Sequence, residues 1–184
     1  MIVLEPFTEA DFPQLIAWID NERLLKEWSG ALFTFPLTED KLRWYIDGAN
    51  DLAHSDVFVY KAVDTRTGET VGHISLGSIS SHNRSGRITR VLVGRQARGR
   101  GYCPAMIKAV LAIGFEQLGL HIITLGVYDF NTAAIRCYRR CGFHLDGTLR
   151  HTVRYQNEYW SSVEMSILEN EWGDTRPAEA AQAA

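Results

Sequence analysis

The chain has 184 residues, of which 46% are hydrophobic, and its formal net charge at pH 7 is −3. This length suits one domain, and the apolar content is sufficient to bury a core. No apolar run approaches the roughly 18 residues of a membrane span, and no cleavable apolar leader opens the chain, so we expect a cytoplasmic protein without a membrane partner. The three cysteines cannot form an even disulfide framework.

The spacing of apolar residues predicts a mixed order of strands and helices in one domain, residues 1–172. In chain order, the expected elements are strand Ile2–Glu5, helix Thr8–Glu27 broken near Asp20 and Asn21, helix Thr38–Gly48, strands Val57–Val63, Thr70–Leu76 and Arg87–Val93, helix Tyr102–Leu118, strand Ile122–Tyr128, a helix capped by Asn131 and Gly142, and strands Phe143–Thr152 and Glu158–Leu168. Residues 173–184 are small, polar and rich in alanine, so we expect a disordered tail there.

A glycine-rich loop, residues 96–101, lies between the strand at 87–93 and the helix at 102–118. The first amides of a helix have no internal partner and lie at the positive end of its dipole, so they attract anions. Gly99 and Gly101 let the backbone approach an anion without a Cβ in the way. A proline such as Pro104 suits a first helical turn, where its missing N–H would be unpaired anyway. The loop therefore predicts a phosphate site.

Two common types of phosphate loop do not fit this segment. A Walker loop has two glycines five positions apart, with Lys-Ser/Thr directly after the second, whereas Gly94 and Gly99 are followed by Arg100 and Gly101. A dinucleotide loop needs an acidic residue about 20 positions later, where this chain has Leu120 and His121. Two interpretations remain. The segment is either a third type of phosphate loop or a glycine-rich turn that binds no ligand.

That third type, Gln/Arg-x-x-Gly-x-Gly/Ala, resembles the pyrophosphate loop that binds acetyl-coenzyme A in the GNAT superfamily of N-acetyltransferases. A second segment resembles the same family, because Asn131, Ala134, Tyr138, Gly142 and Phe143 fit Asn-x-x-Ala-x-x-x-Tyr-x-x-x-Gly-Phe. In the family this asparagine supports the coenzyme and the tyrosine faces the thioester sulfur. Taken alone, the helix face that carries Ala134 and Tyr138 is equally consistent with a stripe of core residues.

The resemblance implies the GNAT fold, an α+β arrangement with a central, mixed, mostly antiparallel twisted sheet whose splayed middle strands are flanked by helices. In this fold the pantetheine arm enters the gap between the splayed strands, which implies an exposed backbone edge at 91–93. The segments Phe33–Leu37 and Leu145–Arg150 look like those of the branch that contains ribosomal-protein N-terminal acetyltransferases. That branch also holds enzymes that act on other amines.

The activity implied by the resemblance is transfer of an acetyl group from acetyl-coenzyme A to a primary amine, by direct attack in a ternary complex. The acceptor is a protein N-terminus or a small-molecule amine, and a homodimer is compatible with the sequence. A catalytically silent domain that binds acetyl-coenzyme A as a regulatory sensor is the alternative. A nucleic-acid-binding module is a third class, but the acidic net charge argues against a nucleic-acid partner.

The resemblance also implies the residues of the site. The coenzyme would be bound by Val91, Leu92, Val93, Gln96, Arg98, Gly99, Arg100, Gly101, Tyr102, Asn131, Ala134 and Tyr138. Tyr138 is the expected general acid. Because a phenol has a pKa of about 10, it protonates a thiolate of pKa about 8.5 only through close positioning. The alternative is a core tyrosine with a satisfied hydroxyl.

The general base and the acceptor site are less well defined by the motifs. Relatives often place a glutamate on the middle strands, where this chain has no carboxylate at 88–90 or 125–126. His73 could accept a proton through water, and a water relay that ends on the backbone is the alternative. The aromatic residues Trp28, Phe33 and Phe35 could form a wall of the acceptor pocket, or they could pack a loop onto the core.

Two further clusters need an explanation. Cys137 and Cys141 lie four residues apart on one helix face and could bind a metal ion, but no nearby cysteine or histidine pair completes a ligand set, so we expect no metal. A basic run consists of Arg84, Arg87, Arg90, Arg95, Arg98 and Arg100. This run could attract the coenzyme phosphates, although a solvated hairpin explains its first members.

Overall fold

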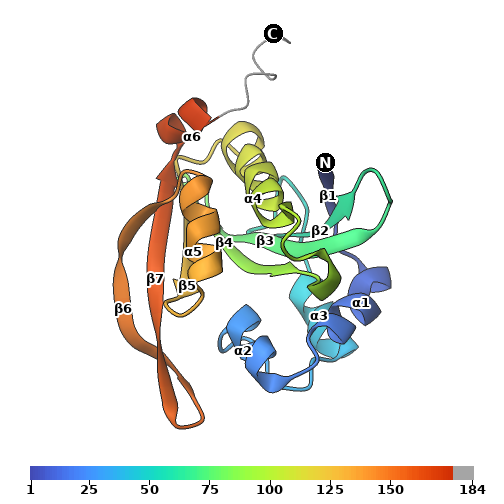
Figure 1. The fold of residues 1–184 in the computed structure, drawn as a ribbon. Coiled ribbons are helices and arrows are strands. Elements are labelled where there is room, and N and C mark those ends of the chain that lie inside the picture. The colour runs from blue at the N-terminus through green and yellow to red at the C-terminus, as the bar shows by residue number, and fades with distance from the viewer. Residues whose placement is uncertain (176–184) are drawn as a thin grey trace.

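Seven strands form one sheet, in the order β1-β2-β3-β4-β5-β7-β6, in the computed structural model, which describes residues 1–175 (Figure 1). The strands are β1 Ile2–Pro6, β2 Phe58–Asp64, β3 Thr70–Ser80, β4 Ser85–Val93, β5 Ile122–Tyr128, β6 His144–Tyr155 and β7 Glu158–Leu168. Neighbouring strands are antiparallel except β4 and β5, which are parallel. The predicted mixed, mostly antiparallel sheet is therefore confirmed.

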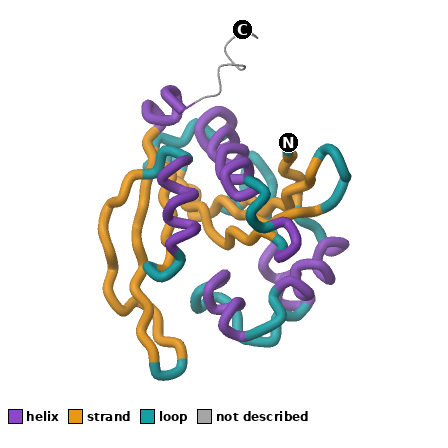
Figure 2. The backbone as a smooth tube through the Cα atoms, viewed as in Figure 1, coloured by secondary structure: helices purple, strands orange, loops and turns teal. Residues whose placement is uncertain are grey.

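Helices cover both faces of this sheet (Figure 2). The helical segments are η1 Glu9–Asp11, α1 Phe12–Trp18, α2 Glu22–Ser29, α3 Glu39–Ile46, η2 Arg95–Ala97, α4 Tyr102–Ala112, the π-helical turn η3 Ile113–Gln117, α5 Thr132–Arg140 and α6 Glu169–Thr175. α4 and α5 lie side by side on one face, and α1, α2 and α3 lie on the other. Within residues 1–175, no helix has both the length and the apolar character needed to cross a membrane.

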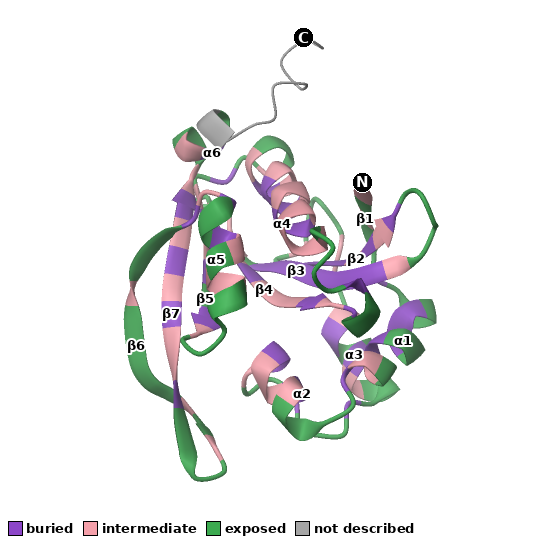
Figure 3. Ribbon diagram, in the orientation of Figure 1, coloured by how far each residue is buried: buried purple, intermediate pink, exposed green. Residues whose placement is uncertain are grey.

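The two faces of the sheet bury separate hydrophobic cores. Phe58 of β2 packs in the core beneath α4 and α5, whereas the next residue, Val59, packs in the core with α1, α2 and α3. This alternation is the ordinary period of a strand buried on both faces. Figure 3 shows the consequence, with β3 largely buried at the centre of the sheet and the edge strand β6 largely exposed.

A β-bulge in β4 opens the sheet at its middle. Ser75 of β3 lies opposite Thr89 and His73 lies opposite Leu92, so β4 holds one extra residue between these pairs. The bulge reverses the alternation, because Ile88 packs under α4 and α5 while Leu92 packs on the opposite face. Pairing between β4 and β5 covers Ser85–Ile88 and Ile122–Leu125. The following residues of β4 and β5 diverge, as the predicted splay requires.

Most of the expected elements are present, and the differences have local causes. The break in the first long helix is an N-cap, because the Asn21 side chain accepts a hydrogen bond from the Leu24 amide. The final helix α6 was not expected, although the Glu171 carboxylate accepts a hydrogen bond from the Leu168 amide and so supports its first turn. α6 includes residues 173–175 of the predicted tail, and residues 176–184 lie outside the described residues.

Candidate active site

The glycine loop and the diverging end of β4 enclose a cavity of about 810 Å³, which we call the loop cavity. Of the residues assigned to the coenzyme, it is lined by Val91, Leu92, Val93, Arg98, Gly99, Gly101, Tyr102, Asn131, Ala134 and Tyr138. Gln96 and Arg100 instead line a neighbouring cavity of about 420 Å³ together with Trp18 and Thr70. The motifs therefore identified residues that the fold does bring together, apart from these two side chains.

The glycines of the loop have the backbone conformation that the motif requires. Gly99 has φ +75° and Gly101 has φ +81°, in the left-handed region that side chains with a Cβ rarely adopt. A Cβ built at either position would meet no protein atom within 4 Å and would lie in open space. Because both glycines line the loop cavity, a Cβ there would occupy space that a ligand could otherwise use.

Tyr102 anchors the start of α4 to the sheet. Its hydroxyl donates a 2.6 Å hydrogen bond to the Asp64 carboxylate at the end of β2. Asp64 is buried, and its other oxygen accepts from the Arg66 amide at 3.0 Å. This contact holds the amides of the first turn of α4 beside the loop cavity.

Three arginines make the loop cavity positive. Arg98 comes from the loop, and Arg136 and Arg140 come from α5. Within residues 1–175 none of the three pairs with a carboxylate, so each guanidinium is available to an anion. Arg136 and Arg140 were not identified from the sequence, although their spacing of four places them on one face of α5. Together with the glycine loop, these charges fit a ligand that carries several phosphates.

The three cysteines gather between α4 and α5. The Cys103 Sγ lies 2.7 Å from the Cys137 Sγ, and the Cys141 thiol lies near the carbonyl of Pro104 at 3.9 Å. The contact with Cys103, with burial added, raises the pKa of the Cys137 thiol to about 12. The common face of Cys137 and Cys141 therefore packs against α4. No cluster of three metal-ligating side chains was found within residues 1–175.

A second cavity, of about 350 Å³, lies between α2, the middle strands and the β6–β7 hairpin, and we call it the hairpin cavity. The hairpin contributes Leu149, Thr152 and Val153 from β6 and Ser162 and Glu164 from β7. The residues that line both this cavity and the loop cavity are Glu27, Trp28, Val91, Asn131 and Tyr138. The two cavities therefore meet where the splayed strands and α5 converge.

Tyr138 lies at this junction. The residue is 6% exposed and packs against Phe143, with ring centroids 6.2 Å apart. Its hydroxyl has no hydrogen-bond partner within the described part of the chain. Burial raises the pKa of Tyr138, so the phenol stays protonated throughout the neutral range. The side chain is thus a proton donor that can act only on a neighbouring atom.

Asn131 has a structural role in addition to lining both cavities. It is the N-cap of α5, because its side-chain oxygen accepts a hydrogen bond from the Ala134 amide at 3.2 Å. The cap sets the position at which α5 begins, and about two turns later the helix brings Tyr138 to the junction.

His73 is not part of this arrangement. It is 1% exposed, lines neither the loop cavity nor the hairpin cavity, and packs among Phe7, Trp28 and Tyr45. Burial, with a smaller contribution from Arg90, lowers the pKa of His73 to about 3. A histidine in this state stays neutral and is a poor acceptor for a proton from an amine. The residue suggested as base from the sequence therefore lies in the core.

The three aromatic residues assigned to the acceptor have different positions. Trp28 lines both cavities, and its Nε1 donates a 2.9 Å hydrogen bond to the Arg90 carbonyl at the bulge. Phe33 stacks on Trp28 with ring centroids 5.9 Å apart. Phe35 lies with Phe33 on a separate cavity of about 250 Å³ between α2 and the hairpin tip. Only Trp28 reaches the junction.

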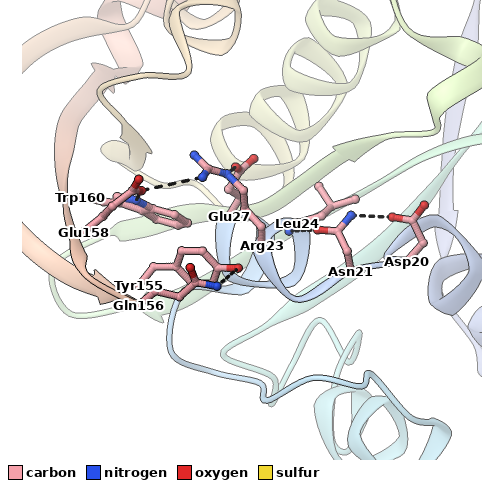
Figure 4. Close-up of polar contacts among 9 residues, drawn as sticks. All are labelled: Asp20, Asn21, Arg23, Leu24, Glu27, Tyr155, Gln156, Glu158 and Trp160. Carbon is pink, nitrogen blue, oxygen red and sulfur yellow. Dashed lines mark hydrogen bonds and ion pairs between the residues drawn. The ribbon is translucent and has the colours of Figure 1, made fainter.

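Glu27 is a carboxylate that the sequence reasoning missed, because that reasoning considered only the middle strands. It projects from α2 to the junction, and within residues 1–175 it is the only acidic residue that lines both cavities. Its Oε1 accepts a hydrogen bond from Arg23 Nε at 3.0 Å. Arg23 in turn reaches Glu158 of the hairpin, with 3.8 Å between Nη1 and Oε2 (Figure 4).

Comparisons with known proteins indicate the family of this chain. A family model described as acetyltransferase (GNAT) domain matches residues 2–144. Spermidine N(1)-acetyltransferase of Escherichia coli K12 is 27% identical over 105 residues, which are 57% of this chain and 56% of that protein. Aminoglycoside N(6′)-acetyltransferase type 1 of Klebsiella pneumoniae is 25% identical over 158 residues, which are 80% of this chain and 76% of that protein.

A solved structure has the same fold. The spermidine N-acetyltransferase from Vibrio cholerae, in complex with CoA and spermine, superposes with a TM-score of 0.80 at 21% identity, over 93% of this chain and 97% of that one. The match to the Escherichia coli relative spans little more than half of that protein. Because the family model covers most of the sequence and the fold agrees with it, the chain belongs to the GNAT family of acetyltransferases, which use acetyl-coenzyme A as the acetyl donor.

Proposed function

We propose that this chain is an N-acetyltransferase that moves an acetyl group from acetyl-coenzyme A to a primary amine by direct attack in a ternary complex. The observation that carries the proposal is the junction of the two cavities at Glu27, Val91 and Tyr138. Two reactants held in adjoining cavities meet at a fixed distance and orientation, so transfer needs no acetylated form of the protein.

The loop cavity is the proposed coenzyme site. Amides of residues 98–102 would bind the pyrophosphate, and the open edge of β4 at 91–93 would pair with the pantetheine arm. The guanidinium groups of Arg98, Arg136 and Arg140 would attract the phosphates. Both left-handed glycines support this assignment, because each keeps the cavity clear of a Cβ.

The junction supplies a proton acceptor and a proton donor. The amine nitrogen attacks the thioester carbonyl carbon, a C–N bond forms, the C–S bond breaks, and the departing thiolate takes the Tyr138 proton. The Glu27 carboxylate accepts the proton that the amine loses, directly or through water, and returns it to Tyr138 through solvent. We assign the base to Glu27 rather than to the buried His73, because only Glu27 lines the junction.

The hairpin cavity is the proposed acceptor site, and its acceptor is a small-molecule amine or a protein N-terminus. The names of the relatives describe acetylation of spermidine and of aminoglycosides. The resemblance to the ribosomal-protein branch, a cytoplasmic location and a homodimer all stay predictions from the sequence.

The experiment is a panel of amines and N-terminal peptides with acetyl-coenzyme A, monitored by release of free thiol. We expect thiol release that depends on the acceptor, together with a mass increase of the acceptor by one acetyl group. Coenzyme binding without transfer to any amine would instead indicate the silent regulatory domain.

A further inference from the structure

The hairpin cavity contains one charge that the described part of the chain does not balance. Its charged lining residues are Glu27, Arg87, Arg90 and Glu164. Glu27 pairs with Arg23 at 3.0 Å, and Glu164 pairs with Arg87 at 2.7 Å. Arg90 forms no ion pair within residues 1–175. The cavity wall therefore carries a residual positive charge at Arg90.

The neighbours of this guanidinium are neutral rings. The Arg90 Cζ lies 4.7 Å from the centroid of the Tyr45 ring, and the Arg90 Nε is buried without a hydrogen-bond partner in the described residues. Tyr45 and His73 are both buried, and burial keeps the phenol protonated and the imidazole neutral. A partly desolvated cation with an unsatisfied N–H is costly unless an anion binds beside it.

The backbone at Arg90 is also unusual. Arg90 is the extra residue at the β4 bulge, and its φ is +53°. A non-glycine residue rarely adopts this conformation, and such local strain is found most often at functional sites. Bulges commonly redirect a side chain next to an active site. Here the bulge turns Arg90 toward the Tyr45 side of the sheet while Val91 and Val93 face the other core.

We propose that Arg90 recognises an anionic group of the acceptor, so that the acceptor class is a primary amine that also carries a carboxylate or a similar anion. The inference rests on the proposed function and names the acceptor of that same site. The cavity volume of about 350 Å³ suits a molecule of amino-acid size or the end of a peptide. Once bound, the anion pairs with Arg90 and the neutral amine faces Glu27 and Tyr138.

A polycationic acceptor is disfavoured by the same geometry. A second ammonium group in the hairpin cavity would meet the unpaired Arg90 charge. The rings of Phe130 and Trp160, which pack against Tyr128 of the cavity wall, could bind such a cation, but the Arg23 guanidinium already lies against both. Its Cζ lies 5.3 Å from the ring centroid of Trp160, 5.7 Å from that of Phe130 and 6.0 Å from that of Tyr155.

The test compares acceptors that differ only at the end distant from the amine. γ-Aminobutyrate, butylamine and putrescine have a primary amine of similar basicity and end in a carboxylate, a methyl group and an ammonium group. β-Alanine extends the comparison to a shorter chain. We expect the wild-type protein to acetylate an amino-carboxylate with a higher kcat/KM than butylamine, and butylamine with a higher kcat/KM than putrescine.

Three variants assign the preference to Arg90. Arg90→Met should lower kcat/KM for the amino-carboxylate by roughly 10- to 100-fold, the range of one hydrogen bond to a charged group, and should change butylamine turnover little. Arg90→Lys keeps the charge and should recover part of the preference. Lys26→Met removes the same charge from α2 outside the hairpin cavity and should leave the preference unchanged.

Two results would overturn the inference. One is a wild-type protein that shows no preference for either amino-carboxylate over butylamine. The other is an equal loss for γ-aminobutyrate and butylamine in Arg90→Met, which would assign Arg90 to the acetyl group or to packing. Neither result would contradict the proposed function. Both are comparisons with the turnover of butylamine, so the protein must already transfer acetyl groups for either result to be seen.

A binding measurement keeps the inference testable without turnover. Calorimetry on the protein saturated with coenzyme A would use butyrate as the anionic probe and butyramide, which is uncharged at every working pH, as the neutral one. Butyrate should bind the wild-type protein and bind Arg90→Met at least 10-fold more weakly. If no acceptor causes release of the coenzyme thiol, the proposed function fails. Unchanged butyrate affinity in Arg90→Met would separately refute the role of Arg90.

Discussion

The Tyr138 hydroxyl lies where the loop and hairpin cavities meet and has no partner within residues 1–175. Tyr138→Phe keeps the ring in its place against Phe143. We therefore expect coenzyme affinity to change little while turnover falls by roughly 10²- to 10⁴-fold, the usual contribution of a general acid. Calorimetry and single-turnover kinetics would measure the two quantities.

An acyl donor with a more acidic thiol provides the control for this prediction. Its thiolate needs a proton less, so the loss caused by Tyr138→Phe should be smaller with that donor. Near wild-type transfer by the Phe variant, under conditions where transfer limits the rate, would return Tyr138 to a purely structural role.

Glu27 can be tested through the pH dependence of turnover. Glu27→Gln keeps the size of the side chain but removes its capacity to accept a proton. We expect kcat/KM near neutral pH to fall by roughly 10²-fold, and the loss to shrink as the pH rises toward the acceptor pKa of about 10, because more of the amine is then already neutral. A rate profile from pH 6 to pH 10 for both proteins would check this. The same fractional loss at every pH would contradict the role of base.

At the scale of elements, the loop between β4 and α4 is the segment that we propose binds the coenzyme. Gly99→Val adds a side chain in open space within the loop cavity, at a residue with φ +75°. We expect calorimetry to detect no binding of acetyl-coenzyme A by this variant, while circular dichroism shows a folded protein.

The turn between β2 and β3 offers a matched control. Gly68 has φ +73° and also has nothing within 4 Å of a built Cβ, but it lies outside both cavities. Gly68→Val should therefore cause similar backbone strain and retain the coenzyme. Equal loss of affinity in both variants would mean that strain, and not the loop cavity, is responsible.

At the scale of the whole molecule, the buried His73 links stability to pH. Its pKa is about 3 in the folded protein against 6.5 as the ordinary value, so between these values the unfolded chain binds more protons. The free energy of unfolding should therefore fall as the pH decreases from 6.5 toward 3, by up to about 1.4 kcal/mol per pH unit. Above pH 6.5 the imidazole is neutral in both the folded and the unfolded chain, so His73 adds no further pH dependence there.

Urea unfolding of His73→Phe at several pH values would measure this contribution. The phenyl ring retains contacts with Phe7 and Trp28 and cannot be protonated, so the variant should have a flatter dependence below pH 6.5. His82→Gln changes an exposed histidine and should keep the wild-type slope. An unchanged slope in His73→Phe would show that other groups cause the acid sensitivity.

Local features of the sequence determined most of the fold and the residues of the proposed coenzyme site. Apolar periodicity predicted each strand and most helices, because a strand or an amphipathic helix repeats its buried positions within a few residues. Gly99 and Gly101 predicted the loop conformation, since it depends on their own φ values. Asn131 and Tyr138 were placed on one helix face by spacing alone, and the fold brings that face to both cavities.

The positions of the charged residues in the hairpin cavity depended on contacts between distant parts of the chain. Only the packing of α2 beside β4 brings Glu27 to Tyr138, more than one hundred residues later in the sequence. Only the extra residue in β4 turns Arg90 to Tyr45, because a simple two-residue alternation predicts a different face. His73 lies within a run of β3 that is buried on both faces, so alternation gives no sign of its surroundings, and three aromatic rings from other elements bury it. Periodicity defines the faces of an element, whereas the side chains that meet across elements depend on tertiary packing.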